Sequence, residues 1–149
     1  MYGGSTCARA ETVCSAYPVR RDRDAARVPT VLIVDDDAKY RRALTAFLGA
    51  SFDLDVVADT GSAEEAVALA GHLRPDAVVV DIAMPIVNGV EVAERLRAVL
   101  PELAIVLVTG NVRGVDPERV QALGNAKLVA KGDPLPVENA LRTLSRRRS

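Results

Sequence analysis

The chain has 149 residues, which fits one domain, and 49% of them are hydrophobic, which is enough for a packed core. Three tyrosines, two phenylalanines and no tryptophan mean that this core must be aliphatic. A net charge of −1 at pH 7 excludes a strong overall basic field that would attract nucleic acid or anionic lipid. No apolar stretch approaches a membrane span, and residues 1–28 lack the apolar segment of a signal peptide. We therefore expect a cytoplasmic protein with no membrane partner.

The first 28 residues lack hydrophobic periodicity and predict a disordered N-terminal tail before a single domain over residues 29–145. Cys7 and Cys14 lie in this tail at a spacing that matches no zinc motif, and the chain has one histidine. Two incidental thiols are the simpler interpretation, and they fit a reducing compartment. Residues 146–149 predict a short basic C-terminal tail.

Five segments from Thr30 onward have the composition of β-strands. Val31–Val34, Ala77–Val80 and Ile105–Val108 are short, apolar and rich in β-branched residues. Uninterrupted runs of this kind are typical of parallel strands that are covered on both faces. Leu54–Ala58 and Lys127–Ala130 are weaker candidates.

Helical patterns lie between and after these segments, where apolar residues recur at the spacing of one helix face. The stripes are Tyr40, Ala43, Leu44, Phe47 and Leu48; Ala63, Ala66, Val67, Ala70 and Leu73; Val92, Ala93, Leu96, Val99 and Leu100; and Val137, Ala140, Leu141 and Leu144. Ser62 and Glu65 predict a capping box at the second stripe. Asp116 and Pro117 predict the start of a further short helix that ends at Gly124.

The order of elements is therefore strand then helix, repeated five times. This alternation predicts a flavodoxin-like (βα)5 fold, a doubly wound parallel sheet with strand order 2-1-3-4-5. Ligands of such sheets bind outside the carboxyl ends of the strands, where the strand order reverses between strands 1 and 3. Asp35, Asp36 and Asp37 follow the first strand and Asp81 follows the third, so we expect both acidic groups at one crevice.

Thr109 and Lys131 follow the fourth and fifth strands and are expected at the same edge of the sheet. Clustered carboxylates do not all ionise unless a cation offsets their charge. An all-oxygen set of ligands suits Mg²⁺, and a carboxylate can also act as a nucleophile that forms an aspartyl phosphate. In that case Thr109 and Lys131 would contact the phosphoryl oxygens.

The sequence resembles the response-regulator receiver domain of two-component signalling from about Thr30 to Leu144. The resemblance is carried by the run VLIVDDD over residues 31–37, DIAMP over residues 81–85 with Asn88-Gly89, Thr109-Gly110 and Lys131. It implies that Asp81 accepts a phosphoryl group from a sensor histidine kinase or a phosphotransfer protein.

The resemblance also implies a role for each of the other site residues. Asp36 and Asp81 would ligate Mg²⁺, with Asp35 acting largely through water and the backbone carbonyl of Ala83 completing the protein ligands. Lys131 would pair with Asp81 and then with the phosphate. Thr109 would turn toward the phosphate and reshape the surface of the fourth helix, fifth strand and fifth helix, through which a homodimer would form.

Two positions depart from the family pattern. Leu128 stands three residues before the lysine, where an aromatic residue is frequent, and Gly132 replaces a frequent proline after it. A residue other than proline at that place resembles receivers that are attached to helix-turn-helix output domains. Asp37 is expected to cap the first helix rather than to bind the metal.

Two other classes of function are compatible with parts of the pattern. A degenerate receiver would act only as a binding module, but it would have lost an acidic position, the acceptor or the lysine. A Mg²⁺-dependent aspartyl phosphatase would need a second acid two residues after Asp81, where Ala83 stands. No output domain is expected after the last helix, so the chain is either a stand-alone receiver or the start of a longer regulator, and DNA binding would require a further domain.

Overall fold

The computed structural model describes residues 28–51 and 53–146. The predicted tails cover residues 1–28 and 146–149, and of these, residues 1–27 and 147–149, with both cysteines, lie outside the described residues. The elements in chain order are β1 (Thr30–Val34), α2 (Ala38–Gly49), β2 (Asp55–Thr60), α3 (Ala63–Leu73), β3 (Ala77–Asp81), α4 (Gly89–Val99), β4 (Ala104–Thr109), the 3₁₀ helix η2 (Val112–Gly114), α5 (Pro117–Ala122), β5 (Ala126–Ala130) and α6 (Leu135–Arg146).

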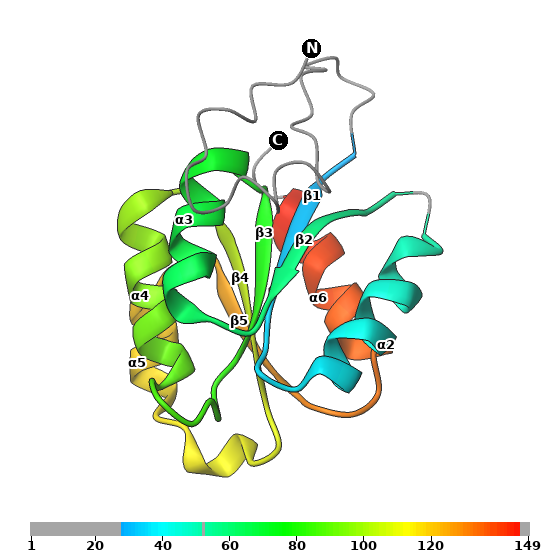
Figure 1. The fold of residues 1–149 in the computed structure, drawn as a ribbon. Helices are drawn as coiled ribbons and strands as arrows, with labels where there is room; N and C mark the ends of the chain where they lie inside the picture. Colours follow the sequence, from blue (N-terminus) through cyan, green and yellow to red (C-terminus); the bar gives the residue numbers. More distant parts are fainter. Residues whose placement is uncertain (1–27, 52, 147–149) are drawn as a thin grey trace.

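The five strands form one parallel sheet in the order β2-β1-β3-β4-β5. Helices α2 and α6 cover one face of this sheet, and α3, α4 and α5 cover the other (Figure 1). The flavodoxin-like fold and its strand order, which were predicted from the alternation of strand and helix, are confirmed.

The sheet separates two clusters of buried side chains, because alternate residues of a strand point to opposite faces. On β3, Val78 and Val80 pack with α3, α4 and α5, whereas Ala77 and Val79 pack with α2 and α6. Every residue of β3 and β4 is buried, which explains why these strands are apolar without interruption. The core is aliphatic, as the composition requires.

The strands extend further than the apolar runs that predicted them. Asp81 is the last residue of β3, where it lies opposite Val108, and Thr109 ends β4 opposite Ala130. Strand β2 continues through Asp59 and Thr60, which pair with the end of β1. The apolar pattern does not predict these extensions, because the residues at the carboxyl ends are polar. They belong to the strands because their backbones pair with a neighbouring strand.

Side chains cap the helices largely where the sequence predicts. The Asp37 carboxylate accepts hydrogen bonds from the backbone of α2, and Asp116 caps α5. The capping box is only half formed: Ser62 accepts from the Glu65 N–H at 3.2 Å, but the Glu65 carboxylate accepts from the Thr60 hydroxyl. Thr60 in turn accepts from the Ser62 N–H at 3.1 Å, so it links the two halves of the box.

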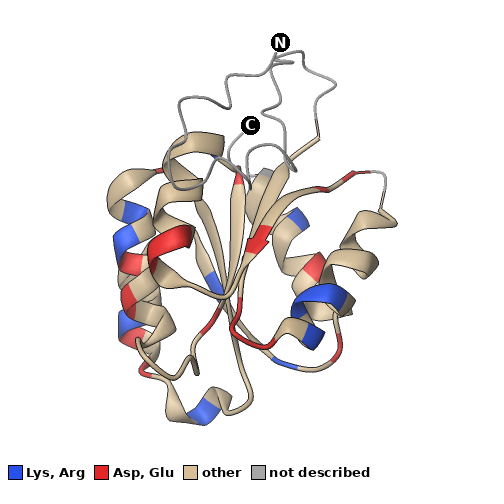
Figure 2. Ribbon diagram, in the orientation of Figure 1, with Lys and Arg blue, Asp and Glu red and all other residues tan. Residues whose placement is uncertain are grey.

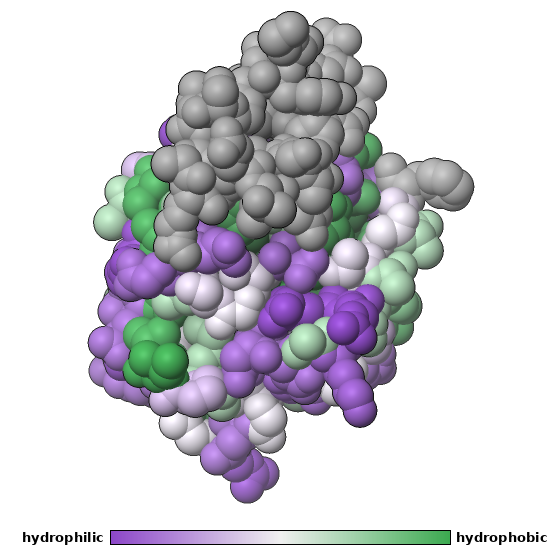
Figure 3. All heavy atoms as spheres, viewed as in Figure 1, coloured by the Kyte–Doolittle hydropathy of each residue, from purple (hydrophilic) through white to green (hydrophobic). Residues whose placement is uncertain are grey.

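The helical stripes lie toward the core, but they are buried to different extents, and Val99 at the end of α4 is 38% exposed. Val137, Ala140, Leu141 and Leu144 of α6 are all buried, as predicted. On α2, only Leu44 and Leu48 reach the core fully, while Phe47 is 37% exposed. Hydrophilic residues cover the centre of the face shown in Figure 3, and hydrophobic patches lie mostly toward its margins. None of the described helices is long and apolar enough to cross a membrane.

Candidate functional site

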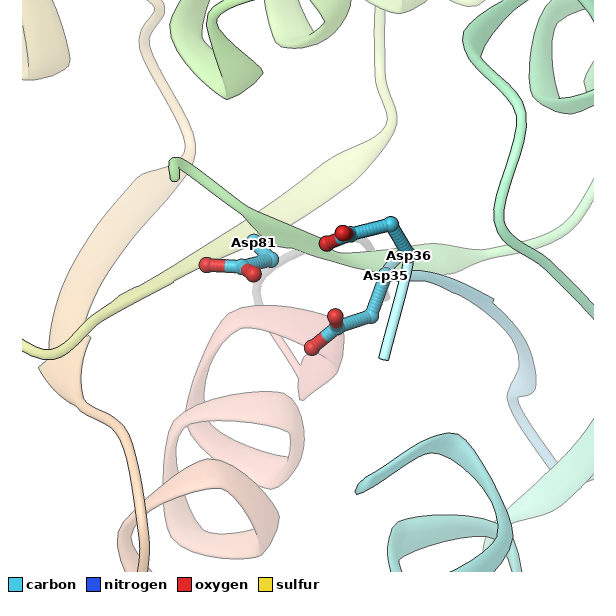
Figure 4. A group of neighbouring side chains, drawn as sticks. All are labelled: Asp35, Asp36 and Asp81. Carbon is cyan, nitrogen blue, oxygen red and sulfur yellow. The ribbon is translucent and has the colours of Figure 1, made fainter. Parts of the chain in front are cut away.

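Three aspartates converge at the carboxyl edge of the sheet, as the predicted topology requires. Asp35 and Asp36 follow β1, and Asp81 ends the neighbouring strand β3 (Figure 4). One carboxylate oxygen from each lies within 4.8 Å of the others. Asp35 and Asp81 are buried and Asp36 is exposed, so the group opens to solvent on one side. Figure 2 shows acidic residues where both of these strands end.

Lys131 supplies the positive charge of the site. Its ammonium nitrogen lies 2.9 Å from Oδ2 of Asp35 and 3.0 Å from Oδ2 of Asp81. It also lies 4.6 Å from the ring centroid of Tyr40, on the first turn of α2. The sequence predicts that Lys131 pairs with Asp81, and the structure adds Asp35 and the Tyr40 ring as further partners.

Backbone groups and one arginine fix the position of Asp35. Its N–H donates to the carbonyl of Thr60 at 2.9 Å, and its Oδ1 accepts from the Asp37 N–H at 2.8 Å. The Arg41 guanidinium donates to the Asp35 carbonyl at 2.5 Å and forms an ion pair with Asp59 at 3.0 Å. The loop after β1 is therefore held against the end of β2.

The end of β3 is held by main-chain contacts. Oδ1 of Asp81 accepts from the Ala83 N–H at 3.1 Å, so donors engage both oxygens of this carboxylate. The Ile82 carbonyl accepts from the Gly89 N–H at 2.9 Å. A Cβ atom on Gly89 would lie 2.2 Å from the Asp81 carbonyl oxygen, so only glycine fits there.

Thr109 lies at the end of β4 and is buried. Its hydroxyl accepts from the Asn111 N–H at 3.1 Å, and its carbonyl accepts from the Lys131 N–H at 2.8 Å. The ends of β4 and β5 are thus tied together beside the aspartates. Leu128, in the strand that carries Lys131, is partly buried against the cluster under α3, α4 and α5.

The electrostatics follow from burying two carboxylates beside one cation. Burial raises the pKa of Asp35 above its ordinary value of 3.8, and hydrogen bonds from Asp37 and Lys131 offset this only in part. Burial alone would lower the pKa of Lys131, but the Asp35 and Asp81 carboxylates raise it above its ordinary value of 10.5. Lys131 therefore stays charged at neutral pH, and the site has more negative than positive groups.

The donor set fits a hard divalent cation. It consists of carboxylate oxygens from three aspartates, and no sulfur or imidazole ligand accompanies them in this cluster. The exposed Asp36 carboxylate leaves one side of the cluster open to waters and to further oxygen ligands, which Mg²⁺ retains in most protein sites. A cation here would also offset the repulsion between Asp35 and Asp81.

Sequence reasoning missed three residues that shape the site. The helical pattern places Tyr40 in the core stripe of its helix, no motif includes Arg41, and Gly89 enters only as part of the family motif. A sequence signal existed for Gly89, because glycine just after an Asn N-cap indicates a close approach of the backbone. The contacts of Tyr40 and Arg41 depend on residues far along the chain, and no local pattern carries them.

Comparisons with known proteins agree with the fold. The sequence model described as the response regulator receiver domain matches residues 31–137. The chain is 40% identical over 79 residues to the DNA-binding transcriptional activator DevR/DosR of Mycobacterium tuberculosis, covering 53% of this chain and 36% of that protein. It is 32% identical over 93 residues to the response regulator protein VraR of Staphylococcus aureus, covering 62% and 44%. The chain thus spans less than half the length of these curated relatives.

Solved structures show the same fold. The REC domain of AraT, a response regulator from Geobacillus stearothermophilus, has a TM-score of 0.71 at 28% identity, covering 81% of this chain and 95% of that one. A LuxR-family two-component response regulator from Aurantimonas sp. SI85-9A1 has a TM-score of 0.74 at 22% identity, covering 81% and 87%. At that identity the second likeness concerns the fold alone. The family match over residues 31–137, on this strand order and this aspartate cluster, shows that the chain belongs to the response regulator receiver domain family of two-component systems.

Proposed function

We propose that Asp81 is the phosphoacceptor of this receiver domain. The observation that carries the proposal is the place of Asp81, buried at the end of β3 with Lys131 3.0 Å from its Oδ2. Its neighbours Asp35 and Asp36 complete an acidic group that suits Mg²⁺. A nucleophile, a fixed cation and candidate metal ligands are thus present within one small site.

The donor is a sensor histidine kinase or a phosphotransfer protein that carries phosphohistidine. A carboxylate oxygen of Asp81 forms a bond to phosphorus as the bond between phosphorus and the histidine nitrogen breaks. The departing imidazole keeps that electron pair and takes up a proton, and the product is an acyl phosphate on Asp81. Lys131 lies where it can neutralise a phosphoryl oxygen, because it already contacts Oδ2 of Asp81.

Asp36 and Asp81, with Asp35 largely through water and the Ala83 backbone carbonyl, would hold Mg²⁺. When bound, the ion would neutralise charge on the transferring phosphoryl group. Lys131 would bind an oxygen of the phosphoryl group. The N–H groups of Asp37 and Ala83 orient the carboxylates of Asp35 and Asp81. In autodephosphorylation, water that reaches the site from the open side would bond to phosphorus as the bond to the Asp81 oxygen breaks, which would release inorganic phosphate and restore the carboxylate.

Phosphorylation adds about −1.5 to −2 charges and three acceptor oxygens to the site. The Thr109 hydroxyl, which accepts from Asn111 in the phosphate-free protein, can donate its proton to one of these oxygens. A bond that forms only with phosphate present biases a two-state element. We propose that the responding element is the surface of α5, β5 and α6, which follows Thr109 along the chain, and that Leu128 repacks where an aromatic residue serves other receivers.

The partners and the output are inferred from the family. DevR/DosR is described as a DNA-binding transcriptional activator and VraR as a response regulator, and both are longer than this chain. We propose the same class of output here, with DNA bound by a domain outside these residues. We also propose that the protein acts in the cytoplasm, where histidine kinases transfer their phosphoryl groups.

Acetyl phosphate with Mg²⁺ tests the acceptor directly. Wild-type protein should gain the mass of one phosphoryl group, which hydroxylamine removes because an acyl phosphate is labile to it. Asp81→Asn should gain none, since an amide is not a nucleophile at neutral pH. An adduct of equal amount in Asp81→Asn would show that another residue accepts the group.

The alternatives predict different results in the same assay. A degenerate receiver would form no adduct and would bind its partner equally well with or without the phosphodonor. An aspartyl phosphatase would hydrolyse generic phosphomonoesters. That activity would need a second acid two residues after Asp81, where Ala83 stands. The retention of all acidic positions and Lys131 favours the phosphorylatable receiver.

A further inference from the structure

The ring of Tyr40 forms one wall of the lysine site. Tyr40 is the third residue of α2, and its ring packs partly against the core cluster between the sheet and α2 and α6. The ammonium of Lys131 lies 4.6 Å from the ring centroid, which is within the range of a cation–π contact. Residues 91 positions apart in the chain therefore meet at the site.

Within the described part of the chain, the ammonium contacts two carboxylates and the Tyr40 ring, and the ring is the uncharged partner. The other two are the carboxylates of Asp35 and Asp81, at 2.9 and 3.0 Å. The Lys131 side chain is 23% exposed, so part of its hydration has been replaced by these contacts. A cation–π contact gains strength when the cation is partly removed from water.

The hydroxyl of Tyr40 does not explain the placement of this residue. Its oxygen is buried and has no hydrogen-bond partner among the described residues. A tyrosine that served through its hydroxyl would direct it at Asp35, Asp81 or Lys131, because a buried polar group without a partner costs stability. What Tyr40 offers to the site is the face of its ring.

We propose that Tyr40 is a positioning residue, which holds the Lys131 ammonium beside Asp81 through its ring while the charge on the carboxylates changes. This inference rests on the proposed phosphorylation of Asp81. When an Asp81 oxygen bonds to phosphorus it loses its negative charge, and the ion pair with Lys131 weakens. The attraction of the ring for the ammonium does not depend on that charge, so it keeps Lys131 in place for the phosphoryl oxygens.

Substitution of Tyr40 and Phe47 on the same helix tests the proposal. Tyr40→Phe keeps the ring and removes the hydroxyl, whereas Tyr40→Leu and Tyr40→Met fill the space without a ring. Phe47→Leu removes the half-exposed ring elsewhere on α2 and serves as the matched control. Rates of adduct formation with acetyl phosphate and Mg²⁺ are compared by intact mass. We expect a fall of about three- to tenfold for Tyr40→Leu and Tyr40→Met, and rates close to wild type for Tyr40→Phe and Phe47→Leu.

A second measurement on the protein without phosphodonor or metal reports the contact itself. The ε-methylene protons of Lys131 should be shifted upfield in the NMR spectrum by the Tyr40 ring current. The shift should persist in Tyr40→Phe and Phe47→Leu and disappear in Tyr40→Leu and Tyr40→Met. A Lys131 shift that is the same in wild type and in all four variants would show that the ring does not contact the ammonium, and would overturn the proposal.

The possible failures can be told apart. If wild type forms no adduct, the proposed function is wrong and this inference falls with it. If wild type reacts, Asp81→Asn does not, and the variants without the ring react at the wild-type rate, only the role of Tyr40 is wrong. A slow Tyr40→Phe would assign the effect to the hydroxyl and would also overturn the proposal.

Discussion

The buried carboxylate of Asp35 lowers the stability of the metal-free protein when it is ionised. Its carboxylate is buried beside Asp81, and burial raises its pKa above 3.8 despite the contact with Lys131. The folded protein therefore binds this proton more tightly than the unfolded chain does. In the absence of metal, the contribution of Asp35 to stability is lost as the pH rises from about 4 through the raised pKa.

Asp35→Asn should consequently stabilise the metal-free protein at neutral pH. We expect its free energy of unfolding at pH 7 to rise by about 1 kcal/mol, because Lys131 keeps Asp81 as a partner and no buried charge is left alone. The variant should also lose much of the dependence on pH between about 4 and 7. Urea denaturation in EDTA across this range measures both effects. Asp36→Asn, at an exposed position, is the control, and a less stable Asp35→Asn would contradict the argument.

Gly89 is a second residue whose identity is set by a single close contact. Its Cβ position lies 2.2 Å from the Asp81 carbonyl oxygen and 2.6 Å from the Ile82 Cα atom, both of which belong to the main chain. Gly89→Ala should destabilise the protein by about 3 kcal/mol or more, because the backbone at the end of β3 must move.

The control for Gly89→Ala is Gly71→Ala. Gly71 is an exposed residue in the last turn of α3, and a Cβ atom there would meet no neighbouring group within 4 Å. Alanine there should raise stability by about 0.5–1 kcal/mol, since it is a better helix former. Chemical denaturation of the two variants compares them directly. Equal effects at the two positions would show that the contact at Gly89 is not restrictive.

At the scale of elements, Arg97 joins the end of α4 to the segment between α5 and β5. Its guanidinium donates to the carbonyls of Leu123 at 2.8 Å and Pro101 at 2.9 Å. Longer bonds reach Leu100, Gly124 and Asn125. A single side chain thus satisfies carbonyl groups at the ends of two helices, where no helical partner remains.

Arg97→Ala should therefore cost about 2 kcal/mol, the range for hydrogen bonds from a charged donor. Amide hydrogen exchange should accelerate most around Leu123 and Asn125, since the loop before β5 loses its support. Arg95→Ala is the matched control, because Arg95 lies two residues away and its ion pair is with exposed Glu64. We expect little change there, as exposed ion pairs contribute little. An equally small effect of Arg97→Ala would refute the role of this connection.

We expect phosphorylation of Asp81 to produce a dimer that forms through α5, β5 and α6. β5 is an edge strand of the sheet, and its residue Lys127 is exposed. The strand ends at Ala130, directly before Lys131 of the site. Light scattering with Mg²⁺ and a beryllofluoride mimic should show the mass rising toward that of a dimer in wild type and remaining monomeric in Asp81→Asn. A wild-type monomer at every concentration would exclude this assembly.

Much of this molecule could be predicted from its sequence because its strands are short, apolar and closed by polar residues. The order of elements located Asp35, Asp36, Asp81, Thr109 and Lys131 at one edge. The extension of β2 to Thr60 could not be predicted, because pairing with β1 and not local composition decides it. The same holds for the Lys131 contact with Asp35 and for the Tyr40 ring, which depend on how distant segments pack.

The sheet that separates the two buried clusters also shapes how such a protein can change in evolution. Side chains under α2 and α6 form one buried cluster, and side chains under α3, α4 and α5 form another. A substitution in one cluster therefore needs compensation only within that cluster, because distant sites contribute independently to stability. Each half of the core can drift while the strand ends keep their aspartates, threonine and lysine. This independence is one physical reason why chains only 22% or 28% identical to this one share its fold.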